Sequence, residues 1–268
     1  MKQHPLGSDV LHRRAVALIF QRPSTRTRLS FETGITELGG HPITLRTEDT
    51  QLSRGESIRD TAYVLSRNVA AIGIRTGPDE LVQEMAQYAS VPVINMLTAN
   101  HHPCQAIADL LTLKENFGQL EGLKLAYVGD GNNVARSLAI LGALAGVKVS
   151  VAAPEGYQLE PVAGAELTDD PYEAVRDANA VYTDVWLSMN DSPETAAARI
   201  EALSSYQLDD QLLAAAAPGA IALHDLPAHP GEEITEQVLY GERQRIWDQA
   251  ENRRHGQKAL LELLCSQD

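Results

Sequence analysis

The sequence predicts an α/β fold of two doubly wound parallel-sheet domains, followed by a C-terminal helix that returns to the first domain. Short β-branched and apolar runs alternate with longer segments of helical period, which is the pattern of parallel strands joined by crossover helices. The chain has 268 residues, a length that suits about two domains. The alternation pauses at Gly118 and then restarts, so we place a domain boundary there.

The first domain is predicted to span residues 1–118. Its strands are expected at 15–20, 42–45, 69–74 and 91–95. Its helices are expected after Ser24, at 56–67, at 78–89 and at 103–116. In the first helix, Phe31 and Ile35 share an apolar face, and Gly39 and Gly40 follow as residues that tolerate the backbone of a helix end.

The second domain is predicted to span residues 119–241, and the returning helix lies within 242–268. Strands are expected at 123–129, 147–153, 180–186 and 220–224, with a helix from about Asn132. Between Ala153 and a short apolar piece at 165–167 there are too few residues for a helical crossover, which needs a dozen or more. We therefore expect a connecting helix to be missing at this point.

Composition narrows the function classes. The net charge of −14 argues against a nucleic-acid partner, while 44% hydrophobic and 22% charged residues are ordinary for a soluble globular chain. The longest apolar stretch, 138–147, has about half the length of a membrane span, and the N-terminus has no signal-peptide pattern, so no membrane partner is expected. Two cysteines cannot form a disulfide framework, which favours a reducing cytoplasm.

The segment at residues 20–32 carries the densest anion chemistry in the chain. A strand ends, Pro23 fixes the entry, and a helix begins at once, so backbone N–H groups and the helix dipole favour phosphate. Ser24, Thr25 and Thr27 add hydroxyl donors, and Arg26 adds a planar fork that can grip two oxygens. The alternative, in which Ser24 is only an N-cap and the arginines are solvated, leaves this concentration of donors unexplained.

The run Ser24-Thr25-Arg26-Thr27-Arg28 resembles the phosphate-binding signature of the aspartate and ornithine carbamoyltransferase family. The resemblance covers nearly the whole chain and continues through residues 51–67, 74–77, 102–113, 129–133, 184–189, 224–233 and 251–260. The motifs DVWLSM and HDLPAH are similar to the ornithine branch. The resemblance implies that the first domain binds carbamoyl phosphate and the second an amino acid. It also implies that no metal or organic cofactor is needed, and that the protein forms a homotrimer or a multiple of one.

The resemblance also implies roles for residues of the carbamoyl phosphate site. His102 donates to the carbonyl oxygen, Gln105 holds the amino group and Arg75 contacts the oxygens, although a His-Pro-x-Gln element by itself more often carries a structural histidine. Arg26, Thr27 and His102 stabilise the tetrahedral oxyanion, while Ser24, Thr25 and Arg253 neutralise the leaving phosphate. Gln51 is expected to act in the active site of a neighbouring subunit. We expect Cys104 to serve packing.

The amino-acid half of the site is expected in the second domain. The turn at 129–133 occupies the place of a dinucleotide-binding loop, but Val134 stands where that motif has its third glycine, so a nicotinamide-dependent dehydrogenase is disfavoured. By resemblance, Asn133 binds the backbone of the amino acid and Asp184 its α-ammonium group. The remaining substrate-binding residues that the resemblance implies are Ser188, Met189 and Leu226.

Several positions depart from the family pattern. Asp225 replaces the cysteine of the HCLP motif near the reacting amine, so Asp184 and Asp225 would hold an ammonium more firmly and make its deprotonation harder. Pro230 stands where an arginine is common, and Asn190 replaces the usual glycine. Only about fourteen residues precede the first strand, so the N-terminal helix of the family is expected to be absent or reduced.

These observations together predict a carbamoyltransferase that converts ornithine to citrulline. A paralogue that uses another amine, such as a shorter diamino acid, is the main alternative, because Asp225 and Asn190 alter the amino-acid pocket. A non-catalytic subunit that binds an anion or an amino acid is a second alternative, favoured by Asp225 and disfavoured by the intact phosphate turn. A role in arginine synthesis, arginine breakdown or a secondary pathway stays open.

Overall fold

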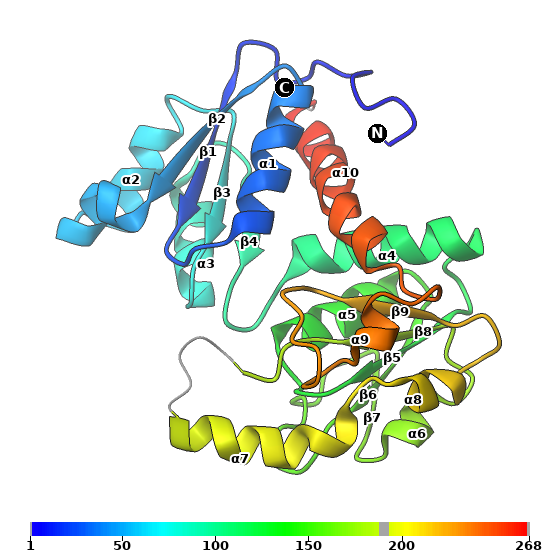
Figure 1. The fold of residues 1–268 in the computed structure, drawn as a ribbon. Helices are drawn as coiled ribbons and strands as arrows, with labels where there is room; N and C mark the ends of the chain where they lie inside the picture. The colour runs from blue at the N-terminus through cyan, green and yellow to red at the C-terminus, as the bar shows by residue number, and fades with distance from the viewer. Residues whose placement is uncertain (1, 188–192, 267–268) are drawn as a thin grey trace. The chain divides into compact units, whose positions relative to one another are not determined.

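The computed structural model describes residues 2–187 and 193–266 and divides the chain into two compact units. The first unit contains Met1–Cys104 and Glu251–Asp268, and the second contains Gln105–Ala250. Both units are α/β structures around a parallel sheet (Figure 1). The predicted fold class is therefore confirmed.

The first unit has a four-stranded parallel sheet in the order β2-β1-β3-β4. The strands are β1 (Ala15–Phe20), β2 (His41–Arg46), β3 (Ala71–Arg75) and β4 (Val93–Leu97). The helices are α1 (Thr25–Glu37), α2 (Ile58–Leu65) and α3 (Asp79–Tyr88), with short 3-10 turns η1 (Thr47–Asp49) and η2 (Gln51–Arg54). One face of the sheet packs on α1 and the end of α10 (Ile246–Cys265), and the other packs on α2 and α3.

The second unit has a five-stranded parallel sheet in the order β7-β6-β5-β8-β9. The strands are β5 (Lys124–Val128), β6 (Lys148–Ala152), β7 (Ala165–Thr168), β8 (Ala180–Thr183) and β9 (Ile221–His224). The helix α4 (Pro103–Phe117) and the helix α5 (Asn133–Leu144) cover one face. The other face packs on α6 (Pro171–Val175), α8 (Asp210–Ala214) and α9 (Glu236–Leu239), while α7 (Pro193–Leu203) and η3 (Ser204–Tyr206) lie between β8 and α8 in the chain.

The connection between β6 and β7 contains no helix, as the short spacing predicted. It packs instead against the turn that follows β5. The backbone N–H of Gly131 donates to the carbonyl of Tyr157 at 2.8 Å, and a Cβ on Gly131 would lie 2.2 Å from the backbone nitrogen of Leu159. Only glycine allows so close an approach, so the shortened connection and the turn at 129–133 depend on each other.

The compact units divide at different places from the predicted domains. The sequence placed all of 103–118 in the first domain, whereas the units separate after Cys104, and Leu113 of α4 packs with Tyr127 in the core of the second unit. Likewise the last helix enters the first unit at Glu251, where Leu261 packs with Phe31. An apolar helix face indicates that a helix is buried, but it does not indicate against which sheet.

Residues 2–14 form turns and no helix. Leu11 is fully buried in the core of the first unit. The ammonium group of Lys258, also fully buried, donates to the Pro5 carbonyl and pairs with the Glu37 carboxylate at 2.6 Å. The N-terminal segment therefore accepts a hydrogen bond from a buried, ion-paired lysine of α10.

Four short or alanine-rich helices, α6 to α9, were not predicted from the sequence. Three of them have only four or five residues, too few to show a helical period. Their starts nevertheless carry ordinary caps: Asp170, Asp209 and Thr235 each accept a hydrogen bond from the first helical turn. Across the part of the chain that the structure describes, no helix combines the length and the apolar character that a membrane span requires.

Candidate active site

The turn between β1 and α1 places three hydroxyl-bearing residues at a helix N-terminus. Ser24 is the N-cap of α1, and its side-chain oxygen accepts the backbone N–H of Thr27 at 3.3 Å. The N-cap interpretation of Ser24 is therefore correct, but capping uses the oxygen as an acceptor and leaves the hydroxyl proton able to donate. Thr25 is exposed and Arg26 is half-buried, so this start of α1 is open to a ligand.

Two guanidinium groups converge on the buried hydroxyl of Thr27. Arg253 of α10 donates to the Thr27 oxygen at 2.8 Å, and Arg75 donates to the same oxygen at 3.5 Å. Parallel pairing of β1 with β3 aligns Arg75 with Phe20, the last residue before this turn, so the sheet register brings Arg75 to the start of α1. Because Thr27 accepts from both cations, its own proton points to a third partner.

His102 lies in the same unit and is neutral. Its side chain is 3% exposed, and burial together with the nearby Arg253 and Arg75 lowers its pKa well below the ordinary value. Each of these causes disfavours the charged imidazolium. A neutral imidazole carries one N–H, so His102 can donate a single hydrogen bond without adding another positive charge.

Cys104 is a buried packing residue beside this cluster. Burial raises the pKa of its thiol to about 11, although Arg253 opposes the shift. The thiol donates to the Asn95 carbonyl at 3.4 Å and packs with Phe31 in the core of the first unit. A thiol in this state is a poor nucleophile, as expected for a packing role.

Gln51 is not brought to this cluster. It lies in η2, where it is exposed, and its side chain makes no hydrogen bond to any residue that the structure describes. Its predicted action in a neighbouring subunit stays a prediction.

In the second unit, polar residues follow the carboxyl ends of β5, β8 and β9. Asn132 caps α5 by accepting the N–H groups of Val134 and Ala135, and its amide nitrogen donates to the Asp184 carboxylate at 2.8 Å. Asn133 is the first residue of α5 and is half-buried. Asn132 was missed from the sequence, although its place directly before an apolar helix is a typical N-cap signal.

Asp184 and Asp225 interact electrostatically. Burial raises the pKa of Asp184 to about 7, with Asp225 as the second cause, while His224 and hydrogen bonds from Val185 and Asn132 oppose the rise. A buried carboxylate beside a second acidic group ionises at a cost, so a nearby cation would favour the charged form of Asp184.

Leu226 belongs to a turn that a buried histidine holds. Its backbone has φ of 65°, which is unusual for a branched residue, and its N–H donates to Nδ1 of His224 at 2.8 Å. His224 is therefore protonated on Nε2, which donates to Glu233 at 3.0 Å. Although burial raises the pKa of Glu233, the hydrogen bonds from His224 and from the His229 backbone hold it below the ordinary value. His224 and Glu233 were not singled out from the sequence.

The remaining predicted residues are Gln105, which is buried in α4, and Ser188 and Met189. Ser188 and Met189 lie outside the described residues, as does Asn190. The structure thus brings Thr27, Arg75 and Arg253 together in one unit, with His102 close enough for both arginines to lower its pKa, and it places Asn133, Asp184 and Asp225 after the strands of the other.

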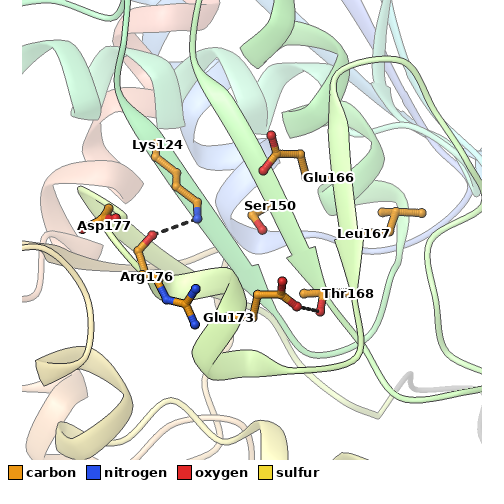
Figure 2. A pocket seen from close by; sticks show the side chains of 8 residues that line it. All are labelled: Lys124, Ser150, Glu166, Leu167, Thr168, Glu173, Arg176 and Asp177. Atoms are coloured by element: carbon orange, nitrogen blue, oxygen red, sulfur yellow. Dashed lines mark hydrogen bonds between the residues drawn. The ribbon is translucent and has the colours of Figure 1, made fainter.

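Two further polar sites carry none of the predicted residues. A hollow of about 240 Å³ lies against the second sheet (Figure 2), where Lys124 donates to the Arg176 carbonyl at 2.8 Å and Thr168 donates to Glu173 at 2.6 Å. His229, Glu232 and Glu233 have donor atoms within 4.8 Å of one another, a spacing that could hold a metal ion. Glu233 already accepts from His224, so its carboxylate has a structural role.

The fold and these two groups of side chains define an α/β protein that offers arginine and hydroxyl donors to an oxyanion in one unit and carboxylates to a cation in the other. Two family profiles match the chain: "Aspartate/ornithine carbamoyltransferase, carbamoyl-P binding domain" over residues 1–115, and "Aspartate/ornithine carbamoyltransferase, Asp/Orn binding domain" over residues 121–264. The chain belongs to the aspartate/ornithine carbamoyltransferase family.

Individual relatives agree with this assignment. The chain is 54% identical over 264 residues to an ornithine carbamoyltransferase of Acidothermus cellulolyticus. The aligned region covers 94% of this chain and 84% of that protein. Its fold is similar to the ornithine carbamoyltransferase of Pyrococcus furiosus, with a TM-score of 0.91, 46% identity, and coverage of 97% and 87%. The Thermus thermophilus enzyme gives a TM-score of 0.90 at 44% identity, with coverage of 98% and 90%.

The neutral state of His102 can be tested by titration. We expect its imidazole NMR signals to stay constant between about pH 6 and pH 8, the range in which an unperturbed histidine loses its proton. Arg253→Gln removes one of the charges that disfavour the imidazolium, so the pKa of His102 should rise in this variant. Arg254→Gln is the matched control, because Arg254 pairs with Glu37 at 3.2 Å. An unchanged His102 titration in Arg253→Gln would contradict the proposed cause.

Proposed function

We propose that the protein is an ornithine carbamoyltransferase, which joins ornithine and carbamoyl phosphate to give citrulline and phosphate. The observation that carries this proposal is the convergence of Arg75 and Arg253 on Thr27 beside a neutral His102, in a chain about half identical to proteins that bear this name. This convergence supplies donors to both an oxyanion and a phosphate.

The reaction is an acyl transfer without a covalent enzyme intermediate. A neutral amine attacks the carbamoyl carbon, a C–N bond forms, and the carbonyl electron pair moves onto oxygen. When that pair returns, the C–O bond to phosphate breaks and phosphate leaves with the bonding electrons. The amine gives up its extra proton, which the departing phosphate can accept. The protein therefore has to stabilise charge on the carbamoyl oxygen and on the departing phosphate.

The residues of the first unit suit both tasks. Thr27 has a proton to give because two arginines already donate to its oxygen, and His102 can donate its one N–H. We assign both to the oxyanion, together with Arg26. Ser24, Thr25 and Arg253 are assigned to the phosphate, where the start of α1 adds the favourable end of the helix dipole.

The residues of the second unit suit a cationic amino acid. We assign Asp184 to the α-ammonium group of ornithine and Asn133 to its backbone, with Leu226, Ser188 and Met189 completing the site. Asp225 is assigned a place near the reacting amine. Ionised carboxylates bind an ammonium group well, but they also raise the pKa of that group and so reduce the neutral fraction that can attack.

Asp225 also favours a second candidate, a carbamoyltransferase of the same family that uses a different amine. Product formation should be assayed over a panel of ornithine, shorter and longer diamino acids and aspartate, with carbamoyl phosphate saturating. The highest kcat/KM with ornithine would support the proposal, and a higher value with another amine would replace the substrate. No product with any amine, from a protein that still binds carbamoyl phosphate, would favour a binding subunit without activity.

We also propose a cytoplasmic homotrimer or a multiple of one, in which Gln51 acts in the site of a neighbouring subunit. Exposure of Gln51 on η2 is compatible with this role, and the two buried cysteines form no disulfide. Light scattering of the active protein should give a trimer or a larger multiple. Full activity from a monomer at assay concentration would rule this assembly out.

Loss of Arg26 should weaken carbamoyl phosphate binding by about 10- to 100-fold, the usual worth of a charged bidentate contact. Calorimetry of Arg26→Ala measures it directly. Arg28→Ala is a suitable control, since Arg28 is exposed on the same helix and pairs with Glu32 at 2.8 Å. Equal affinities of wild type and Arg26→Ala would show that the phosphate binds elsewhere.

Removing the charge at position 225 should shift the pH dependence of the rate to lower pH. Asp225→Asn and Asp225→Cys both remove a carboxylate that keeps the substrate amine protonated, so the rate should begin to rise about 0.5 to 1 pH unit lower. The same variants should lower the pKa of Asp184, because Asp225 raises it. Identical pH–rate profiles would show that residue 225 does not sense the amine. Loss of activity over the whole pH range would instead make Asp225 the proton acceptor.

A further inference from the structure

The carboxylate of Asp109 lies at the centre of a buried hydrogen-bond network in the second unit. Its Oδ1 accepts from the amide nitrogen of Gln105 at 2.8 Å, from the amide nitrogen of Gln249 at 2.7 Å and from the hydroxyl of Tyr182 at 3.5 Å. Asp109, Tyr182 and Gln249 are fully buried, and Gln105 is 1% exposed. An ionised carboxylate only accepts hydrogen bonds, so three donors on one oxygen suit it.

These hydrogen bonds determine which end of the Gln105 and Gln249 side-chain amides faces Asp109. Because Asp109 accepts, Gln105 turns its amide nitrogen toward it, and the carbonyl oxygen of Gln105 is at the opposite end of the group. Gln249 gives an independent check: its nitrogen also faces Asp109, and its oxygen accepts the backbone N–H of His224 at 2.9 Å. A backbone N–H can only donate, so the orientation of Gln249 is determined from both sides.

We infer that Asp109 is a positioning residue that makes Gln105 present a hydrogen-bond acceptor, so that the enzyme selects an acyl phosphate bearing an –NH₂ group. The inference rests on the proposed function, in which Gln105 contacts the amino group of carbamoyl phosphate. If the amide of Gln105 were reversed, its NH₂ would face the NH₂ of the substrate, and two donors would meet.

The consequence is discrimination between carbamoyl and acetyl groups. These groups differ in –NH₂ against –CH₃, which are of similar size, so shape alone separates them poorly. An acceptor held at this point forms a hydrogen bond with the –NH₂ of the carbamoyl group that a methyl group cannot form. Asp109 would thus control specificity without touching the substrate.

Asp109 also stabilises the core, and a purely structural role must be told apart from positioning. Tyr182 stacks on Tyr127 with ring centres 5.6 Å apart, at the middle of the second sheet. A structural defect would weaken every ligand of the site alike. A lost orientation of Gln105 would weaken only ligands that donate to it, so the ratio of two affinities separates the roles.

The test compares two stable analogues of carbamoyl phosphate in which CH₂ replaces the bridging oxygen. Phosphonoacetamide carries –NH₂, and acetonylphosphonate carries –CH₃ at the same place. Wild-type protein should bind phosphonoacetamide about tenfold more tightly, the order of one hydrogen bond to a buried group. In Asp109→Asn the amide at 109 can meet either end of Gln105, so the affinity ratio should fall toward one while acetonylphosphonate binding changes little.

Gln249→Met is the matched control, because it removes one donor from Asp109 and keeps the contact with Gln105; its ratio should stay close to the wild-type value. Thermal unfolding of each variant confirms that it is folded.

An unchanged ratio of the two affinities in Asp109→Asn, or equal loss of both affinities, would overturn the inference. The wild-type ratio tests it without any variant, since equal affinities would exclude an acceptor at this point. If neither analogue competed with carbamoyl phosphate, the proposed function would fail and the inference with it.

Discussion

The hydroxyl group of Thr27 is the point on which the arginine cluster of the first unit depends. It accepts hydrogen bonds from Arg253 and Arg75, which come from α10 and from the end of β3. Parallel register between β1 and β3 and the return of the last helix to the first unit are both needed to bring these cations to one oxygen. The same two cations, added to burial, keep His102 neutral. Fold and electrostatics are therefore coupled at a single residue.

The second unit is organised by carboxylates in the same way. The buried carboxylate of Asp184 accepts from Asn132, and burial together with the nearby Asp225 raises its pKa, so a positive charge beside it would favour its ionised form. Deeper in the unit, Asp109 binds the amides of Gln105 and Gln249, and Gln249 binds the backbone of His224. Buried acidic side chains thus orient the polar groups around them in the second unit. This arrangement places acidic groups in the protein core, which is energetically costly.

Local patterns predicted much of this arrangement. Hydrophobic runs located eight of the nine described strands to within a few residues, while 165–167 was noted only as a short apolar piece. The donors packed after Phe20 predicted an anion site at the start of α1. The missing crossover helix followed from a count of residues between Ala153 and Ala165. Such features depend on neighbours in the chain, which sequence patterns report directly.

Features that depend on distant neighbours were not predictable. Nothing in the sequence near Asn132 or Asp109 indicates that their partners are Asp184 and Gln249, since these pairs form only after the sheet has assembled. That the compact units separate after Cys104 could not be predicted either, because an apolar face on α4 fits either sheet. Sequence patterns therefore indicated candidate substrate-binding residues, but they did not indicate several of the residues that hold those candidates in place.

The rate of citrulline formation in single-turnover experiments with Thr27→Val and Thr27→Ser tests the account most directly. Valine matches the shape of threonine but removes the hydroxyl that the two arginines orient, whereas serine keeps it. Thr27→Val should lose about 100-fold or more in the rate of the chemical step, the usual cost of removing an oxyanion donor, and Thr27→Ser should lose much less. Equal rates for wild type and Thr27→Val would show that the oriented hydroxyl takes no part in the reaction.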